Sequence, residues 1–532
     1  MRVQDIEIPY EKDRSRRYRF FEMLPGIITW SIFILPFVIS FFAPHVFVFI
    51  TILYILLWFV KSVAMLVRNF QGLHKMEQFK KLDWPGMVAD LQAGKVAEDR
   101  RAPKWHQENL ARVKDIKPDD VIHAVFIATY NETREILEPT IQSVLDSHYD
   151  MKKVILVLAY EGRDGAKAEK PVLELAKEYG DKFADTLTYK HPLNPEEVRG
   201  KGGNITYAAR KFQKYLEEKN IDPNHVVVTT LDADNRPDKS YFAELTYLYV
   251  ICPNPLYASF QPTVVFTNNI WDAPAPMRVI ATGNTFWNTV VSTRPHVLRN
   301  FSSHSQGMAA LIETDFWSVR TVVEDGHHYW RTYFRFDGQH EVYPMYLPIH
   351  QDAVFSSSYI KTIKAQFIQL RRWAWGASDI AYVVDKGFFT KNNVPKWDLI
   401  AKLSRLFEGH ISWATAPLIL AGAGYVPILV HPKDFSSNQL PIIAGNIQTV
   451  AMVGILATLY LSLKMLPPKP ARYKKHRTIF MVLQWVLLPF TTILFNAAAA
   501  INAQTRLMFG WYLDKFDVTD KAAKTSDNRT VI

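Results

Sequence analysis

Apolar residues gather at the two ends of the chain, while the middle alternates charged and apolar positions as a water-exposed domain does. Near the start, residues 23–42 and 46–67 are almost free of charge. Near the end, residues 411–430 and 441–463 form a second pair of apolar runs. Each run is close to the roughly 20 residues that a helix needs to cross a membrane. The pattern predicts two membrane hairpins on either side of a folded middle domain.

Lysine and arginine flank these hairpins on one side only. The segment "DRSRRYRF" precedes the first run, and Lys61, Arg68 and Lys75 come near or after the end of the second, whereas the tip "APHV" has no basic residue. The basic loop "KPARYKKHR" follows the second hairpin. Basic loops stay on the cytoplasmic side of membranes, so the middle domain is expected to face the cytosol. The net charge of +10 fits basic residues that are retained on the cytoplasmic side. The single cysteine, Cys252, allows no internal disulfide and fits a reducing compartment.

Between residues 119 and 345 the chain alternates short apolar strands with amphipathic helices. The segments "VIHAVFIATYNE", "KKVILVLAYEGRD" and "HVVVTTLDADNRPD" are predicted strands that run into polar turns, and "TREILEPTIQSVLDS" and "KPVLELAKEYG" are predicted helices. This order predicts an α/β fold whose mainly parallel sheet is covered on both faces. Ligands of such sheets bind beyond the carboxyl ends of the strands, where all three polar turns are expected.

These turns carry groups that suit phosphate chemistry. Asp232 and Asp234 are separated by one residue at a strand end, and oxygen ligands of this kind suit Mg²⁺ or Mn²⁺ shared with a diphosphate. Taken alone, such an acidic pair is more often a turn former or a helix cap. "GKGGNITYAARKF" adds glycines, Lys201 and a following helix whose N-terminus favours anions, although an ordinary helix start has the same composition.

The motifs "ATYNE", "YEGRD", "GKGGN", "LDAD", "VED" and "QLRRW", in this order over residues 121–373, resemble the cytosolic domain of the processive family-2 glycosyltransferases. That group contains the cellulose, chitin and hyaluronan synthases. The resemblance implies a GT-A-type nucleotide-sugar-binding domain between transmembrane helices, in a bacterial inner or plasma membrane. It implies an inverting glycosyltransferase, a hexosyltransferase, that moves a sugar from a nucleotide-diphosphate sugar, expected to be a UDP-sugar, to a growing polysaccharide that it also exports.

The same resemblance assigns roles to individual residues. Nucleotide-sugar binding falls to Thr129, Tyr130, Glu132, Glu161, Lys201 and Asp232; Mg²⁺ or Mn²⁺ to Asp234 with Asp232; general base catalysis to Asp325 with Glu324; and the acceptor and diphosphate to Gln369, Arg372 and Trp373. One departure concerns the second turn, where the family usually has two aspartates and this chain has Tyr160 and Glu161. Glutamate still accepts a hydrogen bond from a base, but the nucleotide preference is then less fixed.

Two of these motifs also have plain structural interpretations. An acidic pair such as Glu324 and Asp325 before a helix commonly caps it. The helix of "QLRRW" is amphipathic, with tryptophan and arginine at the level expected for a membrane surface. For this helix the two interpretations are compatible, because aromatic faces stack on sugar rings and arginine forks to a diphosphate at such a position.

A further match concerns the end of the chain. "FDVTDK" resembles the gating loop FxVTxK of cellulose synthases, which implies that Phe516, Val518, Thr519 and Lys521 close over the nucleotide from the cytosol. The tail must then be cytosolic, and a fifth full crossing would place it outside. We therefore predict that residues 479–510 do not cross the membrane once: Pro489 marks a kink or re-entrant turn, and "NAQTRLMFGWYL" lies along the interface.

The predicted organisation has six parts. These are a transmembrane hairpin (1–68), a linker or interfacial segment (69–117), the glycosyltransferase domain (118–360), interfacial helices (361–408), a transmembrane or re-entrant region (409–511) and a cytosolic tail (512–532). The expected partners are the nucleotide-sugar donor, a polysaccharide or lipid-linked acceptor and membrane lipids, without nucleic acid; a homo-oligomer or an accessory subunit stays open.

Two alternatives remain at this point. The first is an enzyme that adds one sugar to a membrane lipid, since few spans give a polymer channel little wall. The second is a noncatalytic, membrane-anchored nucleotide or nucleic-acid binder, which the net charge and the basic aromatic helix would suit. The basic residues form no dedicated stripe, which disfavours the second alternative.

Overall fold

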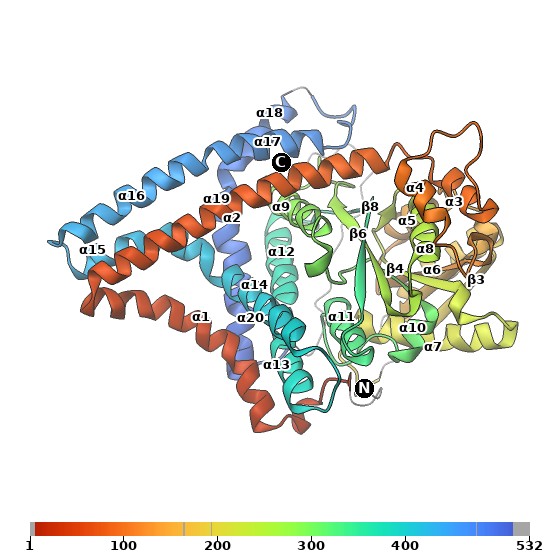
Figure 1. Cartoon of the computed structure of the whole chain (residues 1–532), viewed down its shortest axis with the longest axis horizontal. Helices are drawn as coiled ribbons and strands as arrows, with labels where there is room; N and C mark the ends of the chain where they lie inside the picture. The colour runs from red at the N-terminus through yellow and green to blue at the C-terminus, as the bar shows by residue number, and fades with distance from the viewer. Residues whose placement is uncertain (1–5, 163–164, 193, 475, 514–532) are drawn as a thin grey trace.

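The computed structural model describes residues 6–162, 165–192, 194–474 and 476–513. Its centre is an eight-stranded mixed sheet in the order β3-β2-β1-β4-β7-β6-β8-β5, with the long apolar helices to one side (Figure 1). The strands are β1 (Ile122–Thr129), β2 (Val154–Glu161), β3 (Asp185–His191), β4 (Val226–Asp232), β5 (Arg236–Pro237), β6 (Ala258–Phe266), β7 (Ser305–Gly307) and β8 (Glu341–Gln351). The strands β3, β2, β1 and β4 pair in parallel, and β7 joins β4 and β6 antiparallel to both.

Helices cover both faces of the sheet, as predicted. Val125 and Ile127 of β1 pack in a core with α3 (Trp84–Ala93), α5 (Arg134–Leu145), α6 (Ala166–Tyr179) and α8 (Tyr241–Ile251). Ala124 and Phe126 point the other way, into a core with α7 (Lys201–Lys219) and α10 (Met308–Glu313). Alternate residues of a strand face opposite sides, so a strand buried on both sides must be apolar throughout. The predicted α/β fold class is confirmed.

The strand β3, in the parallel half of the sheet, is not predicted from the pattern of apolar residues. The predicted strands correspond to β1, β2 and β4, while β3 lies at the edge of the sheet next to β2 and was not among them. Its sequence "DTLTYKH" is mostly half-buried, because an edge strand contacts neighbours on one side only. Charged and hydroxyl residues are tolerated there, and the continuous apolar run that marks a central strand is missing.

Part of the segment expected to be a linker packs on the sheet. The helix α2 (Pro44–Phe79) continues about three turns beyond the predicted span, and α3 follows it at once. Trp84, only 1% exposed, donates its indole N–H to Phe79 O at 2.9 Å. In α4 (Lys104–Leu110), the buried His106 Nδ1 lies 2.9 Å from Tyr247 Oη of α8. Residues 84–110 are therefore part of the packing of the sheet domain.

The long apolar helices form two hairpins whose tips lie together, far from the sheet (Figure 1). One is α1 (Arg16–Phe42) with α2; the other joins α14 (Lys396–Gly422) and α15 (Val426–Val430) to α16 (Phe435–Ala451) and α17 (Val453–Lys464). At the tips, His431 Nε2 donates to Phe41 O at 3.1 Å, and His45 Nδ1 lies 2.7 Å from Ser436 Oγ. With Arg477–Phe509, five segments of the described chain are long and apolar enough to span a membrane.

The last of these segments takes a different course. It consists of α18 (Arg477–Leu483), α19 (Leu488–Thr491) and α20 (Ala498–Phe509), joined by a tighter turn at Gln484–Leu487 and a wider one at Thr492–Ala497. These irregular turns lie on both sides of Pro489. Figure 1 shows α20 running across the direction of α2 and α16, and Thr29 Oγ1 of α1 donates to Gln504 Oε1 at 2.6 Å. The membrane topology of this segment stays a prediction.

Candidate active site

One cavity at the carboxyl ends of β1, β2 and β4 collects the predicted site residues that the structure describes. It is lined by Thr129, Tyr130, Glu132, Glu161, Lys201, Asp232, Asp234, Glu324, Asp325, Gln369, Arg372 and Trp373, together with other residues. The predicted gating residues Phe516, Val518, Thr519 and Lys521 lie outside the described residues. The structure therefore brings twelve residues from six separate motifs to one place, while the role of each stays a prediction.

The turn after β1 is held by its own glutamate. Glu132 Oε2 accepts hydrogen bonds from Thr129 Oγ1 at 2.8 Å and from the backbone N–H of Tyr130 at 2.7 Å. Asn204, on the first turn of α7, donates to Thr129 O at 3.2 Å and to Ala159 O at 3.0 Å, which fastens the ends of β1 and β2 together. The other amide atom, Asn204 Oδ1, is buried without a hydrogen-bond partner among the described residues. Asn204 is also one of the residues that line the cavity.

A buried histidine holds the glutamate at the end of β2. His191, the last residue of β3, has Nδ1 3.5 Å from Glu161 Oε2 and Nε2 2.9 Å from Glu197 Oε2. Burial alone would disfavour the imidazolium, but the nearby carboxylates of Glu161 and Glu197 prevail and raise the pKa of His191 to about 9. The imidazole of His191 is therefore charged at neutral pH. No motif in the sequence indicates His191, because β3 itself is not predicted.

A lysine and a serine hold the aspartate at the end of β4. Lys201 Nζ lies 2.6 Å from Asp232 Oδ1, and Ser302 Oγ donates to Asp232 Oδ2. Burial favours the neutral amine, yet attraction to Asp232, Glu324 and Asp325 raises the pKa of Lys201 above its usual value. Lys201 is therefore a fixed positive charge at the centre of the cavity. Ser302 also lines the cavity, in a stretch that carries none of the predicted motifs.

The paired aspartates suit a divalent cation that binds together with a diphosphate. Asp234, 7% exposed, accepts a hydrogen bond at Oδ2 from the backbone N–H of Asp352 at 3.2 Å, and it faces the same cavity as Asp232. Among the described residues no group of three or more histidine, cysteine, aspartate or glutamate side chains could hold a metal on its own. Mg²⁺ and Mn²⁺ accept one or two carboxylates and take their other ligands from water and phosphate oxygens, so these two residues fit such an ion.

The acidic pair of the "VED" motif forms the first turn of α11 (Glu324–Arg335). Asp325 Oδ1 accepts the N–H of Gly326 at 2.7 Å, so this residue does interact with the helix start. Burial raises the pKa of both Glu324 and Asp325; repulsion between them adds to the rise at Glu324, while Lys201 and Arg372 act against it. A carboxylate with a raised pKa next to a fixed cation suits a general base.

A glycine lets this helix approach Lys201. An added Cβ at Gly202, the second residue of α7, would lie 2.5 Å from Ser318 O and 3.0 Å from Glu324 Cβ. The glycines of "GKGGN" were expected to admit a ligand to the backbone. At Gly202 the structure shows a packing reason, because the chain before α11 lies directly against the start of α7; the expected approach of a ligand stays a prediction.

The helix α12 (Tyr359–Ala374) forms part of the cavity wall on the side of the long apolar helices (Figure 1). It packs against α20, and its residues Gln369, Arg372 and Trp373 are half-buried in the cavity wall. The Trp373 ring is 6.4 Å from that of Phe266, the last residue of β6. The wall of the cavity thus contains an aromatic side chain and a guanidinium group from this helix in addition to Lys201.

No protein-family model matches the chain, and no curated protein sequence matches it. Among solved structures, the mannosyltransferase PcManGT from Pyrobaculum calidifontis in complex with GDP-Man and Mn²⁺ aligns with 84% of this chain and 99% of its own, at 14% identity and a TM-score of 0.43. Residues 1–349 of S. aureus TarS in complex with UDP-GlcNAc align with 73% of this chain and 92% of their own, at 11% identity and a TM-score of 0.36. A likeness this remote carries no argument about function, which therefore rests on the residues of the cavity.

Proposed function

We propose that this protein is a membrane-embedded inverting glycosyltransferase that uses a nucleotide-diphosphate sugar, with a UDP-sugar as the expected donor. One observation carries the proposal: six polar motifs, in the order that resembles the family-2 glycosyltransferases, meet in a single cavity at the carboxyl edge of the sheet. Each motif alone has an ordinary structural explanation. A common cavity for all six, with acids, a buried lysine and an arginine facing one another, suits a diphosphate ester.

The donor would lie across the ends of the parallel strands. Thr129, Tyr130 and the carboxylates of Glu132 and Glu161 border the end of the cavity where β1 and β2 stop, which suits the nucleoside. Lys201 and Arg372 offer two positive charges for the diphosphate, and Asp232 with Asp234 would hold Mg²⁺ or Mn²⁺. When bound, this ion would neutralise charge that develops on the leaving diphosphate.

Transfer would follow a single displacement. The acceptor hydroxyl oxygen attacks the anomeric carbon, the bond from that carbon to the diphosphate oxygen breaks, and the hydroxyl proton passes to Asp325. The products are an inverted glycosidic bond, a nucleoside diphosphate and a protonated carboxyl group. The raised pKa of Asp325, caused by burial, increases its affinity for that proton. Trp373, in the cavity wall, offers a ring face to the sugar of the acceptor or donor.

The acceptor is proposed to be a growing polysaccharide, which the bundle of long helices would also export. The position of α12 supports this proposal, because the helix with Gln369 and Trp373 lies between the cavity and α20. Product length separates this proposal from the addition of one sugar to a lipid: ladders or long chains indicate processive transfer, and a single glycolipid band indicates the alternative.

The test is nucleotide release by purified protein in nanodiscs with Mn²⁺, with a panel of UDP- and GDP-sugars. Wild-type protein should release nucleotide with one donor, and Asp325→Asn should reduce release by about 10²-fold or more, because the general base is lost while the shape is kept. Asp99→Asn is the matched control, since Asp99 is exposed and outside the cavity.

Two results would contradict the proposal. Undiminished release by Asp325→Asn would remove Asp325 from the reaction. Folded wild-type protein that binds no nucleotide at all would favour a noncatalytic role and end the glycosyltransferase proposal.

A further inference from the structure

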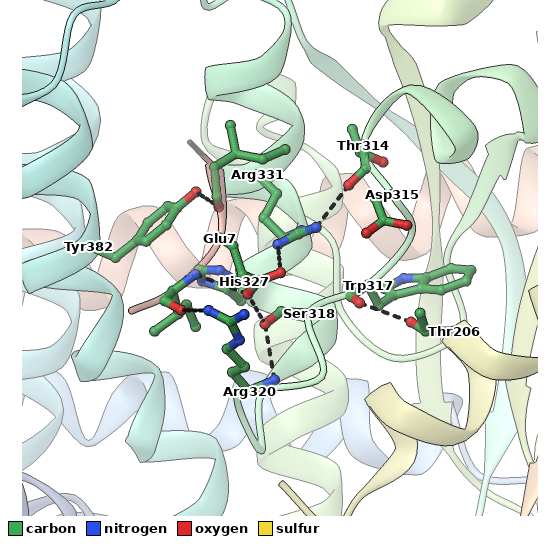
Figure 2. A network of polar contacts seen from close by, with 12 residues as sticks. Glu7, Thr206, Thr314, Asp315, Trp317, Ser318, Arg320, His327, Arg331 and Tyr382 are labelled. Atoms are coloured by element: carbon green, nitrogen blue, oxygen red, sulfur yellow. Dashed lines mark hydrogen bonds and ion pairs between the residues drawn. The ribbon is translucent and has the colours of Figure 1, made fainter. Parts of the chain in front are cut away.

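The segment that precedes the first membrane helix packs into the sheet domain. Ile6 and Ile8 are buried in one core with Trp330 and Tyr333 of α11. Figure 2 shows Glu7 from this segment at the centre of a polar network that includes Arg331 of α11 and the residues before that helix. Residues 6–8, within the predicted hairpin part of residues 1–68, therefore contact the helix of Glu324 and Asp325.

Glu7 forms an ion pair with a buried arginine. Its Oε2 contacts Arg331 Nη1, and its Oε1 accepts a hydrogen bond from Ser318 Oγ at 2.6 Å. The Arg331 side chain is 1% exposed, and its Nη2 donates to Thr314 O at 2.8 Å. Burial opposes ionisation of Glu7, but Arg331 and then Ser318 prevail and hold its pKa below the usual range. A buried arginine without its carboxylate is strongly unfavourable, so this contact fixes α11 and the preceding loop together.

That loop, residues 314–323, connects the two sides of the cavity. On one side Trp317 O accepts from Thr206 Oγ1 of α7 at 2.9 Å, two helical turns or less from Lys201. On the other side the loop leads directly into Glu324 and Asp325. The segment before α1 holds the middle of the loop: Arg320 Nη1 donates to Ile8 O at 2.7 Å, and the Arg320 guanidinium lies 3.6 Å from the centre of the Tyr10 ring.

The segment also reaches the helix that follows α12. In α13 (Asp379–Val384), Tyr382 Oη donates to Ile6 O at 2.6 Å. The same helix contacts α11 directly, because Asp379 Oδ1 lies 2.8 Å from His327 Nδ1, two residues after Asp325. Residues 6–10 thus touch the loop, α11 and α13, the three elements around the acidic pair, and Glu7 is the charged group at their junction (Figure 2).

We propose that Glu7 is a positioning residue for the transfer reaction: through Arg331 and Ser318 it holds the loop 314–323 and the first turn of α11 where Asp325 meets the acceptor hydroxyl. The proposal rests on the proposed function of the cavity. It goes beyond that function because Glu7 lies outside the cavity wall and belongs to no motif of the resemblance. The polar contacts of Glu7 with other elements go to Arg331 of α11 and Ser318 of the loop, while the turns after β1 and β2 lie on other elements, so donor binding should change little.

The test compares Glu7→Gln with Glu11→Gln in the full-length protein in nanodiscs. Glu11 lies in the same segment and is exposed, which makes it the matched control. In Glu7→Gln, kcat per nucleotide-binding site should fall by about 10- to 100-fold while the KM for the donor stays within about twofold, because the base is displaced and the donor site is intact. Hydrogen–deuterium exchange of residues 314–335 should increase, and Glu11→Gln should match wild-type protein in all three measurements.

Unchanged exchange in 314–335, or an unchanged kcat, would overturn the proposal. A parallel rise in KM and loss of nucleotide-binding sites would also overturn it, since that result indicates general unfolding. If Glu7→Gln does not fold, Tyr382→Phe provides a second test, because it removes only the hydroxyl that contacts Ile6 O. This variant should also have a lower kcat, and wild-type kinetics would refute the positioning role. Absence of nucleotide release by wild-type protein would instead refute the proposed function, while the exchange comparison still reports whether Glu7 anchors the loop.

Discussion

Replacement of Gly202 by alanine tests the close contact between the start of α7 and the chain before α11. The backbone of Gly202 is helical, so alanine is conformationally acceptable there, and the new methyl group is the only perturbation. It would lie 2.5 Å from Ser318 O and 3.0 Å from Glu324 Cβ, whereas ordinary contacts begin at 3.4 Å. Ser318 O must therefore retreat by about 0.9 Å, because a close-packed interior offers no spare volume.

Two magnitudes follow from that displacement. Overpacking of this kind costs about 1–3 kcal/mol of stability, which exceeds the gain of less than about 1 kcal/mol from alanine in a helix. Because Glu324 and Asp325 move with the loop, and an error of about 1 Å in a catalytic group costs about 10²-fold in rate, the loss of activity should exceed the loss of folded protein. We expect Gly202→Ala to retain nucleotide binding and to lose about 10- to 100-fold in kcat.

The assay is nucleotide release per nucleotide-binding site, with thermal unfolding measured on the same samples. Gly283→Ala is the matched control: Gly283 lies in α9 (Ala275–Ser292), and an added Cβ there meets no described atom within 4 Å outside its own helix. This control should be at least as stable as wild-type protein and equally active. A Gly202→Ala protein with wild-type kcat and stability would refute the view that this contact sets the position of the acidic pair.

Three further results are expected. His191→Gln should lower the free energy of unfolding by about 1–2 kcal/mol below pH 6.5. Because the pKa of His191 is raised to about 9, its stabilising effect is complete below pH 6.5 and is lost as the pH rises through 9. Urea melts of the two proteins should therefore converge above pH 9, and a difference that stays constant with pH would contradict this account. Arg372→Lys should reduce kcat/KM by about tenfold in the nucleotide-release assay, because a point charge replaces the guanidinium fork, and equal kinetics would remove Arg372 from diphosphate binding. Lys201→Met should raise the KM for the donor and reduce nucleotide affinity in calorimetry by about 10- to 100-fold, and unchanged affinity would show that Lys201 serves only as the partner of Asp232.

The centre of the sheet and the main motifs were predictable because one physical signal marked both. Strands buried on two faces are apolar throughout, and polar residues can only begin where such a strand leaves the sheet. The polar turns "TYNE", "YEGRD" and "DADN" therefore mark the ends of β1, β2 and β4. The parallel pairing of these strands brings the three turns to one edge of the sheet. The position of "QLRRW" in the same cavity needed the resemblance, since no local pattern relates α12 to the sheet.

The supporting residues were not predictable, because their partners are distant in sequence and their own surroundings look ordinary. His191 ends an edge strand that carries no apolar run. Ser302 lies in a loop, and its role depends on contact with Asp232, 70 residues away in the chain. Glu7 is 324 residues from Arg331 and stands in a short polar stretch before a basic cluster. The composition of that stretch gives no sign that Ile6 and Ile8 are buried or that Glu7 pairs with Arg331.

The charges in the cavity make the strength of the proposed base depend on what is bound. Lys201 and Arg372 both hold the pKa of Asp325 down against the effect of burial. In the proposed reaction these two cations contact the diphosphate of the donor. The negative charge of the diphosphate offsets the effect of the two cations on the pKa of Asp325. A divalent cation on Asp232 and Asp234 would act in the opposite direction, because its positive charge favours the ionised form of Asp325. In the proposed reaction the proton affinity of Asp325 is therefore set by the donor diphosphate and its cation together with Lys201 and Arg372, and not by burial alone.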